Sequence, residues 1–107
     1  MKRFTAYGFG ILAVALFLVT AAYAHTPLCS CYDNGDKTVT CDGGFSDGSS
    51  AAGVNMSVKD QSGKVLIKGK MDKNSSFTFK KPAGPYKVVF DAGPGHVVEI
   101  DGKTITE

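Results

Sequence analysis

Apolar and polar residues alternate with a period of two along most of the chain after residue 24. Val54, Met56 and Val58 alternate with polar neighbours, and the same pattern returns in two later segments. Such alternation is typical of β-strands with one buried face. The positions expected to face the core include Val58, Phe77, Phe79, Tyr86, Val88 and Phe90.

Turn-forming residues interrupt the alternation at short intervals, as in Asn34-Gly35, Ser62-Gly63 and Asp101-Gly102. About seven strands of four to eight residues fit between these interruptions. Two sheets that meet through their apolar faces bury such stripes in a single core. The sequence therefore predicts an all-β fold, a small antiparallel β-sandwich with no helix. Residues 43–53 lack periodicity and are expected to form a loop, with Phe45 packed against the core.

The first 24 residues have a different pattern, because a basic start is followed by an apolar run and the small-residue ending Ala22-Tyr23-Ala24. This order is typical of a secretory signal peptide cleaved after Ala24, and the apolar run is too short to span a bilayer. We therefore divide the chain into a signal peptide (1–24), a cysteine-containing hairpin and loop (25–52) and the remainder of one sandwich domain (53–107).

Removal of the signal peptide changes the charge of a 107-residue chain whose formal net charge is +2. The ten lysines that remain balance ten acidic residues, and no arginine remains. A neutral domain without arginine lacks the basic surface that nucleic-acid binding requires. No second apolar run follows Ala24, so we expect a periplasmic or secreted protein with no stable membrane insertion after processing.

Cleavage after Ala24 would give His25 an α-amine beside its imidazole, and two nitrogens of one residue can chelate a metal ion. Their ordinary pKa values, about 7.7–8.0 and about 6.5, let a metal compete with protons at neutral pH. His96, the other histidine of the chain, follows Pro94 and Gly95, where we expect the backbone to turn. The two histidines are therefore the candidate metal ligands, and they suit Ni(II), Co(II), Cu(II) or Zn(II) equally. The alternative is that one is a terminal residue and the other a turn residue, with no metal role.

Three cysteines in an exported chain leave one thiol over after any internal disulfide. A hairpin centred on Gly35 sets Cys29 opposite Cys41, so we expect a Cys29–Cys41 bond and a free Cys31. A Cys31–Cys41 bond requires the register to shift by one paired position. Because residues two apart share a face of a strand, all three thiols point the same way. The reduced trio could instead bind Zn(II) or Cu(I), with His25 as a fourth ligand.

The segment from Gly53 to His96 resembles the carboxypeptidase regulatory-like, or transthyretin-like, β-sandwich. The likeness lies in a valine strand, a D-x-x-G turn, an F-x-F strand and a P-x-G-P-Y-x-V strand. The resemblance implies a transthyretin- or immunoglobulin-like sandwich, and this scaffold serves many functions. A start at His25 and the phrase Ala92-Gly93-Pro94-Gly95-His96 are similar to small periplasmic accessory components of nickel and cobalt uptake transporters. This chain departs from that pattern because it has no C-terminal membrane helix.

These observations predict a periplasmic binding protein for nickel, cobalt or copper. The resemblance implies a role accessory to metal uptake, with a membrane metal transporter or another envelope protein as the partner. The alternative is a structural or protein-interaction module of the cell envelope without a metal role. We expect no enzymatic activity, because no catalytic acid, base or nucleophile motif accompanies the histidines.

Overall fold

The computed structural model describes residues 25–107, and the signal peptide predicted over residues 1–24 lies outside this range. The described residues form seven strands and one short 3₁₀ helix. The elements are β1 (Pro27–Asp33), β2 (Thr38–Phe45), β3 (Asn55–Asp60), β4 (Val65–Lys70), β5 (Ser76–Lys80), β6 (Tyr86–Asp91), β7 (Val97–Asp101) and η1 (Gly102–Thr104). The predicted all-β class is confirmed, whereas η1 was not expected. Within residues 25–107 no helix has the length and apolar character of a membrane span.

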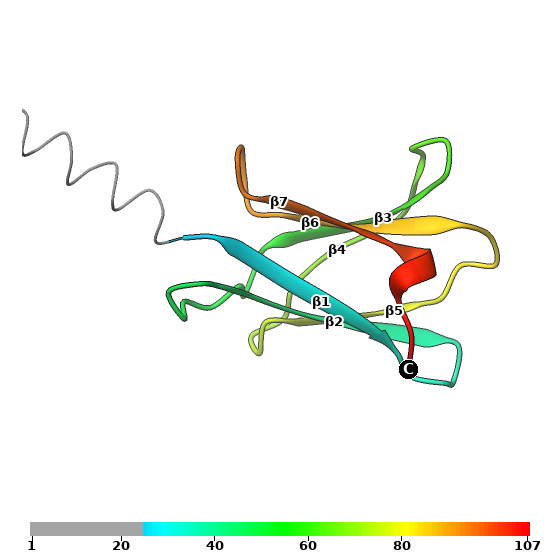
Figure 1. Cartoon of the computed structure of the whole chain (residues 1–107), viewed down its shortest axis with the longest axis horizontal. Coiled ribbons are helices and arrows are strands. Elements are labelled where there is room, and N and C mark those ends of the chain that lie inside the picture. The colour runs from blue at the N-terminus through cyan, green and yellow to red at the C-terminus, as the bar shows by residue number, and fades with distance from the viewer. Residues whose placement is uncertain (1–24) are drawn as a thin grey trace, which may run out of the picture.

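The strands form two antiparallel sheets that lie face to face, with the orders β1-β2-β5 and β4-β3-β6-β7 (Figure 1). The chain passes from one sheet to the other after β2, after β4 and after β5. β1 lies against β7 along one side of the sandwich. The segment after η1 returns to the end of β1, where the Asp33 amide donates to the carbonyl of Thr106 (2.9 Å). This arrangement is the predicted small β-sandwich.

The core lies between the two sheets and includes the alternating positions predicted from the sequence, together with residues that were not predicted. Val58, Val88 and Phe90 are fully buried on the four-stranded sheet, as are Val39 and Cys41 on the three-stranded sheet. Among the other expected core positions, Phe79 and Tyr86 are buried and their rings meet edge to face, whereas Phe77 is partly buried against the cluster. The expected inward positions of β3, β5 and β6 are therefore confirmed.

The loop expected over residues 43–53 starts later than predicted, because β2 continues to Phe45. Gly43 permits this extension, since a Cβ atom there would lie 2.7 Å from the Phe90 ring. The Phe45 ring packs on the Phe90 ring at a centroid distance of 6.1 Å, as expected. The shortened loop leaves the core at Phe45 and returns to it at β3.

The β1–β2 hairpin has a different register from the one predicted. Its turn is centred on Asp36 rather than Gly35, because Lys37 adopts a left-handed backbone (φ 71°) and belongs to the turn. Asp36 accepts a hydrogen bond from the Thr38 amide (3.1 Å) and stabilises this turn. The shift pairs Cys31 with Cys41.

Candidate functional site

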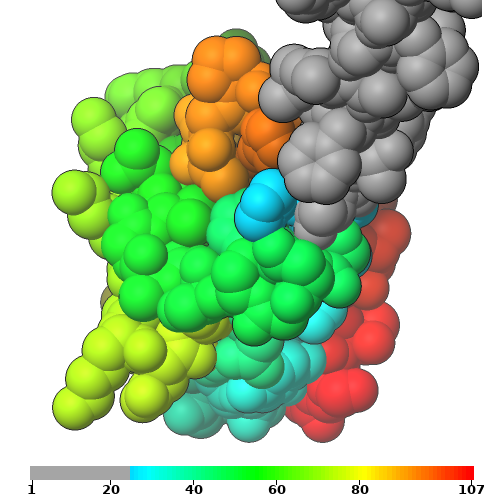
Figure 2. All heavy atoms as spheres, turned by 90° about the vertical axis from the view of Figure 1, so that its left-hand side faces the viewer, coloured from blue at the N-terminus to red at the C-terminus, as the bar shows by residue number. Residues whose placement is uncertain are grey.

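The candidate site lies at the end of the sandwich where β1 begins. Antiparallel pairing places the start of β1 beside the end of β2, and the end of β6 beside the starts of β3 and β7. Figure 2 faces this end and shows the start of β1 (blue) close to the β2–β3 loop (green) and the β6–β7 turn (orange). The predicted ligands His25 and His96 belong to two of these segments.

His25 is held against the β2–β3 loop by an ion pair with Asp47. Its Nδ1 atom lies 2.8 Å from the Asp47 Oδ2 atom, with side chains 57% and 27% exposed. The backbone beside His25 is fixed in the same place, because Thr26 and Ser46 exchange two hydrogen bonds. The Thr26 amide donates to Ser46 Oγ (3.1 Å), and the Ser46 amide donates to the Thr26 carbonyl (2.9 Å).

Asp47 is oriented toward His25 by its own turn. The backbone amide and the hydroxyl of Ser49 both donate to Asp47 Oδ1, at 3.0 and 2.6 Å. These hydrogen bonds from Ser49 lower the pKa of Asp47, and the neighbouring His25 lowers it further. Asp47 is therefore ionised at neutral pH, and its second oxygen is the one that faces His25.

His96 ends a tight turn between β6 and β7. Gly93 and Gly95 take positive φ values (111° and 78°), which glycine adopts without strain. The His96 amide donates to the Gly93 carbonyl (2.9 Å), and the His96 carbonyl accepts from the Ala92 amide (3.0 Å). The Nδ1 atom of His96 donates to the Pro94 carbonyl at 3.1 Å. This tautomer leaves the Nε2 lone pair available to a ligand.

The structure thus places the two predicted histidines at one end of the molecule. It also shows that Asp47, which was not predicted, contacts His25. In the described chain, His25, His96 and Asp47 do not form a single cluster of ligand atoms. Asp47 was not predicted as a site residue, because residues 43–53 carry no periodicity that would place its side chain. The Asp47-Gly48-Ser49 turn sequence was the available signal, since a turn aspartate bonded through one oxygen keeps the other free.

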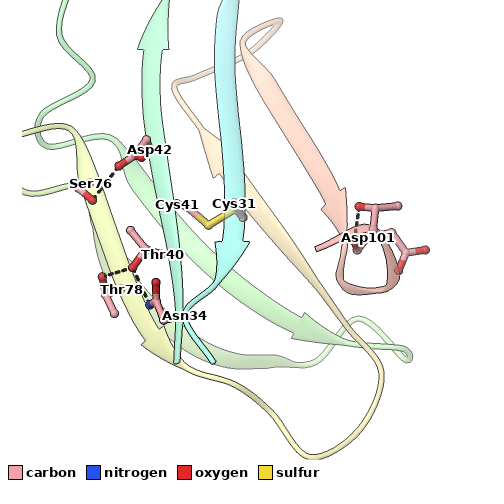
Figure 3. Close-up of a disulfide and its surroundings, with 9 residues drawn as sticks. Cys31, Asn34, Thr40, Cys41, Asp42, Ser76, Thr78 and Asp101 are labelled. Carbon is pink, nitrogen blue, oxygen red and sulfur yellow. Dashed lines mark hydrogen bonds between the residues drawn. A yellow bond between two sulfur atoms is a disulfide. The ribbon is translucent and has the colours of Figure 1, made fainter. Parts of the chain in front are cut away.

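The cysteines form a second cluster inside the hairpin, where Cys31 and Cys41 are joined by a disulfide (Figure 3). The predicted Cys29–Cys41 bond is wrong. The residue opposite Cys29 is Gly43, so Cys41 lies diagonally from Cys29, at a spacing that is too long for a disulfide without backbone movement. The free thiol is Cys29, not Cys31. The prediction that all three side chains share a face is confirmed, since the three sulfur atoms lie within 4.8 Å of one another.

The free thiol of Cys29 is kept protonated by its surroundings. Burial raises its pKa to about 11, and the negative charge of Asp42 adds to the effect. A protonated thiol is a weak nucleophile, which explains how it persists beside a disulfide. His25, the fourth ligand in the alternative of a reduced metal-binding trio, is not part of this cluster and contacts Asp47 instead.

Comparison of the chain with protein-family models, curated proteins and solved structures gave no match. The β-sandwich is therefore established by the strands and their pairing alone. The likeness to carboxypeptidase regulatory-like domains stays a prediction.

Proposed function

We propose that the protein, processed to begin at His25, binds one divalent transition metal ion at the end of the sandwich where β1 begins. The observation that carries this proposal is the distance of 2.8 Å between His25 Nδ1 and Asp47 Oδ2. Metal–nitrogen and metal–oxygen bonds of about 2.0–2.2 Å set two ligands at a right angle about 2.9 Å apart. The two atoms are already spaced as neighbouring ligands of one ion.

In the proposed site, the α-amine and Nδ1 of His25 chelate the metal ion, which replaces the proton between Nδ1 and Asp47. Asp47 then supplies a carboxylate oxygen, and the Ser49 hydrogen bonds hold that carboxylate in place. His96 supplies a further nitrogen when the glycine-flanked β6–β7 turn closes over the ion. Right-angled nitrogen and oxygen ligands suit Cu(II) and Ni(II), and Co(II) accepts the same donors.

The proposed setting is the periplasm or the exterior of the cell, in a role accessory to metal uptake. The Cys31–Cys41 disulfide supports an oxidising compartment. Nickel, cobalt or copper would then be cargo for a membrane transporter. This last step rests on the resemblance of the His25 start and the Ala92–His96 phrase to transporter accessory components.

The test is calorimetric titration of Ni(II), Co(II) and Cu(II) into two proteins at neutral pH. One begins at His25, and the other retains Ala24, which removes the free amine while keeping every side chain of the site. Loss of an outer-shell partner of a metal ligand usually costs about 10–100-fold in affinity. The α-amine is itself a ligand in the proposed site, so we expect the extended protein to lose at least that much. His96→Ala should weaken binding by less, because the chelating pair survives. Equal affinities for the native and extended proteins would contradict the proposal.

A second candidate function is a protein-interaction module of the envelope without a metal role, and one surface favours it. A shallow groove of about 660 Å³ is lined by apolar residues and three lysines: Leu66, Ile67, Pro82, Ala83, Lys37, Lys80 and Lys81. In the described chain, the neighbouring strands β4 and β5 are each paired on one side only. Free strand edges beside a basic, apolar groove suit an extended acidic segment of a partner. Equal metal affinities in the titration above would favour this function.

A further inference from the structure

The hairpin cluster gathers three sulfur atoms that the proposed histidine site does not use. Cys29 and Cys31 lie two residues apart on β1, and Cys41 pairs with Cys31 across the hairpin. We propose that the reduced hairpin is a second metal site, in which Cys29, Cys31 and Cys41 bind one Cu(I) ion. This site is independent of the proposed function, because it uses other residues and another oxidation state.

The spacing of the sulfur atoms fits a shared ion. Sulfur ligands at about 2.3 Å from one metal lie about 4 Å apart in a trigonal arrangement. The three sulfur atoms lie within 4.8 Å of one another. Opening the disulfide lets the Cys31 and Cys41 sulfurs separate, while the hairpin register holds their Cα atoms 4.0 Å apart. The hairpin register therefore groups the three ligands, and the Cys31 and Cys41 sulfurs move apart on reduction to reach one ion.

The number and type of ligands favour Cu(I) over Zn(II). Within residues 25–107 no histidine, aspartate or glutamate joins the three cysteines as a fourth ligand. Structural Zn(II) sites are almost always tetrahedral with four protein ligands, whereas soft thiolates also select Cu(I). Three sulfurs without a fourth partner match the softer ion.

The surroundings shield the cluster from water. Cys41 is fully buried in the core, and Cys29 and Cys31 are partly buried against it. Burial and the negative charge of Asp42 both raise the pKa of the Cys29 thiol, so a free thiolate would be unfavourable here. A bound cation offsets the thiolate charge, and this couples loss of the thiol protons to metal binding.

The chemistry balances with a dithiol as the reductant. The dithiol gives two electrons and two protons to the Cys31–Cys41 bond, which becomes two thiols, and the dithiol becomes a disulfide. Cu(I) then replaces thiol protons, which pass to the solvent. The copper ion is neither oxidised nor reduced in this step.

The test measures Cu(I) binding to protein that begins at His25, reduced with a dithiol and freed of it without oxygen. Cu(I) is titrated in competition with a chromophoric Cu(I) chelator, and X-ray absorption counts the sulfur neighbours of copper. We expect one Cu(I) per chain with three sulfur neighbours. Cys29→Ser should lower the affinity at least about tenfold and leave two sulfur neighbours. Ser30→Ala, an exposed neighbour on the same strand, is the matched control and should bind as the unaltered protein does.

Two further measurements separate this site from the histidine site and from unfolded chain. The His25→Ala, His96→Ala double variant should keep its Cu(I) affinity, whatever the outcome for divalent metals. Near-ultraviolet circular dichroism should show packed aromatic residues in the Cu(I) form. Equal Cu(I) affinity in Cys29→Ser, two sulfur neighbours in the unaltered protein, or a reduced chain that stays unfolded with Cu(I) would each overturn the proposal.

Discussion

Substitution of Asp47 tests most sharply whether His25 belongs to a metal site or only lies beside a charged residue. If its carboxylate binds the ion, Asp47→Asn should weaken Ni(II) or Cu(II) binding by about 10–100-fold, because the amide is a neutral and weaker ligand. The Ser49 hydrogen bonds can still form with the amide oxygen, so the turn should be kept. Calorimetric titration of the protein that begins at His25 checks this. Asp42→Asn removes a carboxylate from β2, outside the loop that carries Asp47, and should leave the affinity unchanged. An Asp47→Asn protein that also keeps its affinity would remove Asp47 from the site.

Asp33 provides a prediction for pH dependence at the end of β1. Lys81 donates to Asp33 Oδ2 at 2.8 Å, and this hydrogen bond, followed by that from the Gly35 amide, lowers the Asp33 pKa. A carboxyl with a lowered pKa in the folded state stabilises the fold above its unfolded pKa of about 3.9. That contribution is lost as the pH falls through the lower, folded value. In an NMR titration, Lys81→Gln should raise the Asp33 pKa toward its ordinary value, whereas Lys80→Gln should not. An unchanged Asp33 pKa in Lys81→Gln would show that the pair is not maintained in solution.

At the scale of the strands, β5 tests whether alternation identifies the core. Phe79 is 5% exposed and packs between Phe77 and Tyr86, at ring distances of 6.0 and 6.1 Å. Phe79→Ala should therefore lower the free energy of unfolding by about 3–5 kcal/mol. The exposed neighbour Lys80→Ala should change it by less than about 0.5 kcal/mol. Denaturant unfolding of the two variants checks the prediction, and similar losses in both would mean that the strand does not present alternate faces.

The β1–β2 hairpin tests the pairing of the cysteines. Alkylation of the unreduced, denatured protein followed by peptide mapping should label Cys29 alone. Cys29→Ser should keep the disulfide, whereas Cys31→Ser removes it and should cost about 2–4 kcal/mol of stability. A label found on Cys31 would restore the register centred on Gly35.

The sequence predicts those features that depend on repeated local patterns. Val58, Val88 and Phe90 were identified because each strand repeats its inward position every two residues, and burial follows from that repeat. The hairpin register depends instead on the conformation of the turn, where Gly35 and Lys37 both take left-handed φ values. A lysine rarely adopts such an angle, so its identity does not reveal the turn. The resulting turn pairs Cys41 with Cys31 rather than with Cys29.

The candidate site was predictable only in part, for a related reason. The chemistry of His25 is local, since its amine and imidazole belong to one residue. Its contact with Asp47 depends on how the β2–β3 loop folds back over the start of β1, through the paired hydrogen bonds of Thr26 and Ser46. Loop contacts of this kind carry no periodic signal.

For the whole molecule, the proposed metal ion has a mechanical consequence. β1 and Asp47 belong to the three-stranded side of the sandwich, whereas the β6–β7 turn with His96 extends the four-stranded sheet. An ion held by His25, Asp47 and His96 would therefore link the two sheets at one end. Because the ion binds the folded protein, a free concentration of 100 times Kd should add about 2.7 kcal/mol to the stability. In a domain of this size, that corresponds to a rise in Tm on the order of 10–20 °C.

Thermal unfolding with Ni(II) or Cu(II), and again after addition of a chelator, measures this link directly. The protein that begins at His25 should gain the full rise and lose it with the chelator. The Ala24-extended protein should gain little, since its affinity is lower.

His96→Ala tests whether the ion links the two sheets, because it keeps the chelating pair at His25 but removes the ligand on the four-stranded sheet. When the metal is supplied at 100 times the variant's own Kd, mass action alone gives His96→Ala the same stabilisation. What the variant should lose is protection of β6 and β7 amides against hydrogen exchange by local opening near the turn. If metal protects these amides equally in both proteins, the ion does not link the sheets through His96.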